Sequence, residues 1–261
     1  MNKIDTIVYP FILWSLLQGS IEAFLANYTN GSVTFTEVLA LWEPRAQFWF
    51  LYSLFFIFLI SGFIFSYISY DHIFALFLLS CALYIFKNIL PNTAIIYFTA
   101  SNLVFFLLGV FFTNYKLHRI FNSNLSLVTV SILFVISQYW FHFLLGMTYL
   151  DVGIASLVVA TIGIFMVTTV SIHLCKTPSN VLGYVGASSL AIYLMHTLAG
   201  SGVRILLQKG IGLESATLHL VLGCIAGIMF PLLALRLFRI FRIKYALSAP
   251  ISNLFVARMK D

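Results

Sequence analysis

The chain has 261 residues, of which 61% are hydrophobic and only 8% are charged, and its mean hydropathy is +1.02. Soluble domains carry roughly 25% charged residues, so this composition excludes a soluble protein and predicts an all-α polytopic membrane protein. The net charge of +6 comes from basic residues in the flanks of apolar segments. That placement is typical of loops held on the cytoplasmic side and does not indicate nucleic-acid binding.

About eight segments approach the ~20 apolar residues that a membrane-spanning helix needs. In chain order they cover Thr6–Ala26, Gln47–Tyr70, Ile73–Phe86, Ile95–Thr113, Leu125–Phe143, Gly153–Leu174, Val181–Leu207 and Thr217–Phe241. The first is too long for a cleaved signal peptide and contains Gln18 and Glu22, so we expect it to stay in the membrane. The third is short, and Asp71-His72 before it is either a tight turn between two helices or part of one bent hairpin.

The outer loop between the first two segments contains TFTEVLALWEP, which predicts a short interfacial helix. Thr34 or Thr36 would cap its start and Pro44 would end it. The loop can serve as a lid over a substrate, whereas Trp49 just after it is of the type that anchors a helix at the interface.

The distribution of Lys and Arg predicts the orientation. With alternating spans, ten of the 14 basic residues fall on the side of the two chain ends. We therefore predict a multi-pass protein of the cell membrane with both termini in the cytoplasm.

The segment Val181–Leu207 is apolar enough to span the membrane but carries a polar stripe. Steps of three or four residues place Ser189, Tyr193, His196, Gly200 and Arg204 on one helix face. Hydrocarbon offers these side chains no partners, so we expect the stripe to face protein or a water-filled cavity.

Several polar groups whose burial in lipid is energetically unfavourable fall in the same half of the membrane. A rise of ~1.5 Å per residue places Gln18, Glu22 and His196 in the outer half, where Arg45 and Arg204 also lie. Ionisable residues within a membrane indicate function, so the sequence predicts that these groups share one cavity.

Each of these residues also has a purely structural interpretation, and the sequence leaves the functional and the structural interpretation open. His196 can be a core histidine bonded to a carbonyl of a neighbouring helix. Glu22 can pair with Arg45 or Arg204 simply to hold the first helix, because a carboxylate in lipid needs a cation or a proton. Arg45 can extend toward the lipid headgroups.

The three cysteines, Cys81, Cys175 and Cys224, do not show the spacing of a disulfide framework or a zinc site. We expect neither a disulfide nor a bound metal.

Three stretches resemble the membrane-bound acyltransferase 3 family. Leu182-Gly183 followed by Ser189-Leu-Ala-Ile-Tyr-Leu-Met-His196 resembles its late-helix signature, and Phe48-Trp-Phe-Leu51 resembles its WFL-type helix start. Tyr9-Pro10 before an apolar run is similar to the helix that follows the family's first cytoplasmic loop. The resemblance covers nearly the whole chain and implies a single acyltransferase-like domain over residues 1–261. The histidine and arginines of the family's first two helices have no counterpart here, so we expect the chain to lack those helices.

The resemblance implies a membrane O-acyltransferase that moves an acyl group, usually acetyl, from acyl-CoA to a hydroxyl of a surface glycan or glycolipid. Two alternatives stay open: a carrier or flippase for a lipid-linked sugar, and an inactive truncated acyltransferase. The expected partners are the lipid bilayer and the acceptor. The candidate catalytic residues are His196, Tyr193 and Glu22, and the candidate substrate-binding residues are Arg45, Arg204, Trp49 and Gln18.

Overall fold

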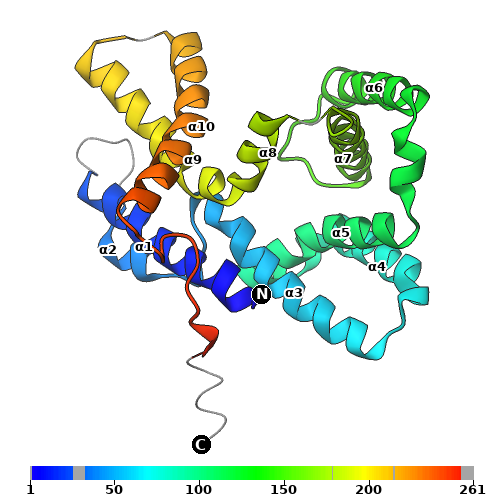
Figure 1. Cartoon of the computed structure of the whole chain (residues 1–261). Helices are drawn as coiled ribbons and strands as arrows, with labels where there is room; N and C mark the ends of the chain where they lie inside the picture. The colour runs from blue at the N-terminus through cyan, green and yellow to red at the C-terminus, as the bar shows by residue number, and fades with distance from the viewer. Residues whose placement is uncertain (1, 26–32, 178, 214, 254–261) are drawn as a thin grey trace, which may run out of the picture. The chain divides into compact units, whose positions relative to one another are not determined.

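The computed structural model describes residues 2–25, 33–177, 179–213 and 215–253, and in these ranges every regular element is helical (Figure 1). The longer helices are α1 (Tyr9–Phe24), α3 (Trp49–Tyr67), α4 (Ile73–Ile85), α5 (Ala94–Asn114), α6 (Asn124–Tyr139), α7 (Ile154–Leu174), α8 (Asn180–Ala187), α9 (Ser189–Ile205) and α10 (Ala216–Ile240). The shorter elements are η1 (Ile4–Val8), α2 (Phe35–Leu39), η3 (Ala46–Phe48), η4 (Tyr70–His72), η5 (Lys87–Ile89), η6 (Leu117–Asn122), η7 (Trp140–Leu144) and η8 (Leu206–Gly210).

Seven helices in the described ranges are long and apolar enough to cross a membrane, which confirms the polytopic all-α class. They are α3 with η3, α6 with η7, α9 with η8, α1 with η1, and α5, α7 and α10 alone. Large apolar side chains such as Leu125 and Val167 lie exposed on them, as lipid contact requires.

Two of the expected segments differ from the structure. The third, α4, has 13 residues and is shorter than a full span, so seven long helices and one short one replace the expected eight. The segment over 181–207 is not one helix, because it breaks at Ser188 into α8 and α9. The break follows Gly186 and lies at the Ser188-Ser189 pair, a combination at which helices commonly kink.

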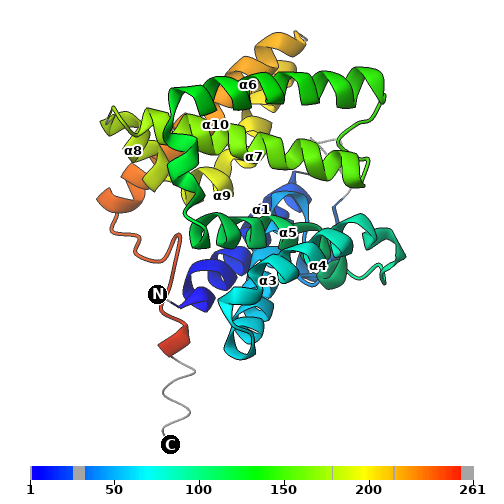
Figure 2. The same ribbon diagram turned by 90° about the vertical axis from the view of Figure 1, so that its right-hand side faces the viewer.

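The chain forms two compact units, with the boundary inside α3. The first comprises residues 1–55 and 180–261, and the second residues 56–179. In the second unit α4 packs on α5 and α6 packs on α7, and the α6–α7 pair lies side by side in both views (Figures 1 and 2). The centre of the α4–α5 pair is a buried cluster of Ile57, Ile73, Leu103 and Leu107.

In the first unit α9 and α10 form the most extensive helix pair, and α1 packs against α2 and α9. The short helix expected in the outer loop is confirmed as α2, but it ends at Leu39 and therefore before Pro44, the residue expected to end it. Thr34 caps it, because the Thr34 hydroxyl accepts from the Glu37 amide while the Glu37 carboxylate accepts from the Thr34 amide.

The segment after α10 folds back onto the start of the chain, and we call residues 242–253 the C-terminal strap. The Tyr9 hydroxyl donates to the Tyr245 carbonyl at 2.8 Å, and the Trp14 indole donates to the Ala246 carbonyl at 2.8 Å. The Asp5 carboxylate accepts from the Ser252 amide at 2.8 Å and from the Ser252 hydroxyl at 2.6 Å. The strap is therefore fixed to η1 and α1 along its length.

Candidate active site

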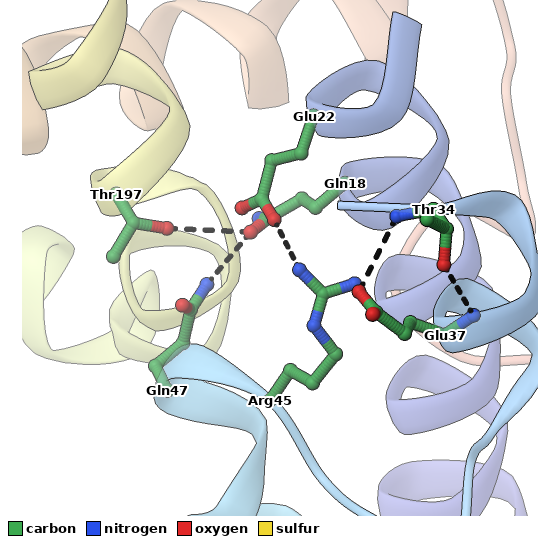
Figure 3. A network of polar contacts seen from close by, with 7 residues as sticks. All are labelled: Gln18, Glu22, Thr34, Glu37, Arg45, Gln47 and Thr197. Carbon is green, nitrogen blue, oxygen red and sulfur yellow. Dashed lines mark hydrogen bonds and ion pairs between the residues drawn. The ribbon is translucent and has the colours of Figure 1, made fainter. Parts of the chain in front are cut away.

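Gln18 on α1 is the centre of a polar network that joins three helices (Figure 3). Its side chain is only 3% exposed. Oε1 accepts from Gln47 Nε2 at 2.9 Å and from Thr197 Oγ1 at 3.3 Å, and Nε2 donates to the Leu194 carbonyl on α9. A buried amide with its groups bonded in this way fixes the relative positions of α1, η3 and α9.

Glu22 lies one turn after Gln18 and forms an ion pair with Arg45, with 2.8 Å between Oε2 and the Arg45 guanidinium (Figure 3). The Glu22 side chain is 43% exposed and that of Arg45 is 33% exposed. The expectation that Glu22 pairs with a cation is confirmed, and the partner is Arg45. Both charges are neutralised by this pair, which favours a role in holding α1 against η3.

Tyr193 on α9 is bonded to the same region. Its hydroxyl donates to the backbone carbonyl of Gln47, and its ring packs edge to face on Phe50 with centroids 5.6 Å apart. The phenolic proton is thus already engaged by the protein. Trp49, the residue before Phe50, also packs edge to face on the Phe50 ring, with centroids 6.1 Å apart, and is 36% exposed.

A groove of about 1040 Å³ lies between α9 and α10. From α9 and η8 it is lined by Ile192, His196, Thr197, Gly200, Ser201, Arg204 and Gln208, and from α10 by Ala216, His219, Leu220, Gly223, Cys224, Gly227 and Ile228. Figure 1 shows the two helices spread apart toward the turn that joins them. The groove is mainly apolar, with a few polar side chains, which is the usual character of a small-molecule site.

His196 lies toward the inner end of this groove, where it faces Gly227 of α10. The two helices lie close together there, because a Cβ at Gly227 would be in ordinary van der Waals contact with the His196 Cβ at 3.5 Å and with its carbonyl oxygen at 3.7 Å. The His196 Nδ1 lies 2.8 Å from the Tyr193 carbonyl and 3.1 Å from the Ile192 carbonyl. Since a carbonyl only accepts, Nδ1 carries the proton in these bonds, and in neutral imidazole Nε2 has the lone pair.

His219 faces the same groove in the opposite tautomer. Its Nε2 bonds the Leu213 carbonyl at 2.8 Å, so Nε2 is the protonated atom. Among the residues that the structure describes, the histidines, cysteines and carboxylates do not assemble into a group of three that would hold a metal ion.

The expected single cavity is divided in two. His196 and Arg204 line the α9–α10 groove, whereas Gln18 and Glu22 line a separate cavity of about 250 Å³ beside α1. Helix α9 is the wall between them, because its residues Thr197 and Ser201 line both. The physical reason is helical geometry: the 196, 200 and 204 positions form one ridge that faces α10, and neighbouring positions about 100° around the helix face α1.

Thr197, Gln208 and Cys224 are lining residues that the sequence analysis did not select. A threonine, glutamine or cysteine in an apolar run has no distinguishing spacing. Only Thr197, directly after His196, offered a signal by its position.

A family model described as an acyltransferase domain matches residues 1–236, a range that includes all of the second unit, most of the first and both walls of the groove. The chain gave no match to any curated protein, and none to any solved structure.

Proposed function

Because the chain belongs to the acyltransferase 3 family, we propose that this membrane acyltransferase transfers an acyl group, usually acetyl, from acyl-CoA to a hydroxyl of a surface glycan or glycolipid. The observation that carries the proposal is the position of His196 in the α9–α10 groove with its Nδ1 fixed by two carbonyls of its own helix. That arrangement prepares Nε2 to act as a base.

A sugar hydroxyl is a weak nucleophile until a positioned base removes its proton. In the proposed reaction His196 Nε2 takes the hydroxyl proton while the acceptor oxygen forms a bond to the thioester carbonyl carbon. The tetrahedral intermediate collapses by breaking the carbon–sulfur bond. The leaving thiolate takes the proton from the imidazolium, so the products are the ester and free CoA.

The oxyanion of the tetrahedral intermediate needs a hydrogen-bond donor in the same groove. Arg204 lies two turns after His196 on the same ridge and lines the groove. We propose that its guanidinium donates a hydrogen bond to the oxyanion or to an acceptor hydroxyl. Tyr193, Gln18, Glu22 and Arg45 act as positioning residues in this proposal, because their polar groups are bonded within the protein.

With α4 counted as an eighth crossing, the charge distribution supports an orientation with both termini on the cytoplasmic side of the cell membrane, since ten of 14 basic residues then fall on that side. The groove then widens toward the outer face, where a surface acceptor would enter. His196 at the inner end would be the part of the groove nearest a cytoplasmic donor.

Acetylation of surface glycan in cells complemented with variants tests the proposal. His196→Gln should lower the acetylation rate by about 100-fold or more, the usual contribution of a general base, and Arg204→Gln by a similar factor. The controls are His118→Gln and Arg119→Gln, exposed residues of η6 in the other unit. Unchanged acetylation in His196→Gln would exclude the mechanism, and glycolipid transport without acyl-CoA would favour the carrier alternative.

A further inference from the structure

A third cavity, of about 410 Å³, lies at the end of α10 remote from the turn after α9, and we call it the basic pocket. Three cationic residues line it, Arg239, Arg242 and Lys244, together with apolar residues of the last turns of α10 and further residues of the strap. None of its lining residues is acidic. No carboxylate of the described ranges forms a recorded ion pair with these three side chains.

At this helix end Arg242, which lines the pocket, has a strained backbone conformation. Arg242 has φ of +54°, the left-handed conformation in which glycine is the usual residue. The Ile243 amide donates to the Phe238 carbonyl at 2.8 Å and the Arg242 amide donates to the Arg239 carbonyl at 3.2 Å, which is the Schellman arrangement that ends a helix. A non-glycine residue at this position is disfavoured, and such strain concentrates at functional sites.

The strap forms the opposite wall of the pocket. Ala246, Leu247 and Ser248 line it. The bonds that Tyr9 and Trp14 donate to the strap carbonyls of Tyr245 and Ala246 hold this wall in place. The cations therefore surround a preformed cavity. If they served only to contact lipid headgroups or to stabilise the helix dipole, they could equally lie along a free helix end.

The pocket also lies at a suitable distance from the reacting centre. Gly227 contacts His196, and Arg239 is twelve residues further along the same helix, which corresponds to about 18 Å at the rise of an α-helix. This distance is comparable to the extended pantetheine arm of CoA, which separates its phosphates from its sulfur.

From these observations we propose that the basic pocket binds phosphate groups, and that the ligand is the nucleotide end of the acyl-CoA donor. The assignment to acyl-CoA rests on the proposed function. Arginine is the side chain best suited to phosphate oxygens because its donors form a planar fork.

Calorimetric titration of CoA into the full-length protein in phosphatidylcholine nanodiscs tests this, because it needs no acyl transfer. CoA should bind more tightly than dephospho-CoA, and dephospho-CoA more tightly than pantetheine. Arg239→Gln and Lys244→Gln should each weaken CoA binding by about tenfold, the effect of losing one charged hydrogen bond. The control is Arg236→Gln, which removes the same charge one turn earlier on α10 from an exposed residue outside the pocket.

Arg242→Gly separates binding from folding. Glycine relieves the left-handed strain, so the thermal midpoint should stay the same or rise while CoA affinity falls about tenfold. Equal CoA affinity in the pocket variants and in Arg236→Gln would overturn the proposal. Phosphatidylglycerol that copurifies with the wild type and prevents CoA binding would overturn it too, because the occupant would then be a lipid headgroup. CoA binding that depends on the pocket without any glycan acylation would leave this inference standing and refute the proposed function.

Discussion

Gln18 and Leu194 are 176 positions apart in the chain, and the side-chain amide of Gln18 donates to the backbone carbonyl of Leu194. This bond joins α1 to α9 two residues before His196. The helix that carries the proposed base is therefore held by the first helix of the chain through a buried polar contact. The contact sets the position of α9 but leaves the groove on its other side open.

Gln18→Leu should reduce the free energy of unfolding by about 1–3 kcal/mol, because Gln47 and Thr197 lose their shared acceptor inside the protein. The thermal midpoint in detergent, followed by intrinsic fluorescence, measures the change. Gln208→Leu at an exposed position is the matched control and should shift stability by less than about 0.5 kcal/mol. Equal midpoints for the two variants would show that the network does not hold α1 to α9.

Gly19→Ala should destabilise the contact between α1 and α2. The new Cβ would lie 2.9 Å from Cγ1 of Val38, a stiff β-branched side chain that is 5% exposed. We expect a loss of about 1–3 kcal/mol of stability from this overpacking. The double variant Gly19→Ala, Val38→Ala should be less destabilised than the sum of the single variants, because the clash is relieved.

The control for Gly19→Ala is Gly109→Ala within α5, where a Cβ would meet no atom within 4 Å. This substitution should stabilise the protein by up to about 1 kcal/mol, through higher helix propensity. Opposite signs for Gly19→Ala and Gly109→Ala in thermal unfolding are the expected result. A stabilising Gly19→Ala would mean that α2 is not packed on α1 as described.

Asp5→Ala should release the C-terminal strap, since Ser252 loses both bonds to the carboxylate. Trypsin should then cleave more rapidly after Arg242 and Lys244, and mass spectrometry of the released fragments measures the rate. The control is Asp71→Ala, which alters an exposed aspartate of η4 in the other unit. Equal cleavage rates in the two variants would argue that the strap is held by other contacts.

The sequence by itself determined the protein class, most of the spans and a capped helix beginning at Thr34 or Thr36, and it offered a turn at Asp71-His72 as one of two interpretations. These features depend on local properties: hydropathy summed over ~20 residues, and side chains that bond the backbone within one turn. For the same reason the polar residues of α1 and α9 could be selected by their cost in hydrocarbon.

Only the tertiary structure decided which of these groups meet. Glu22 had two candidate arginines and pairs with Arg45, while Arg204 lies with His196 in a groove on the other side of α9. The break at Ser188 and the strap over α1 were also beyond the sequence. Which face of a helix meets which neighbour depends on packing between residues far apart in the chain, and periodicity along one helix carries no information about that choice.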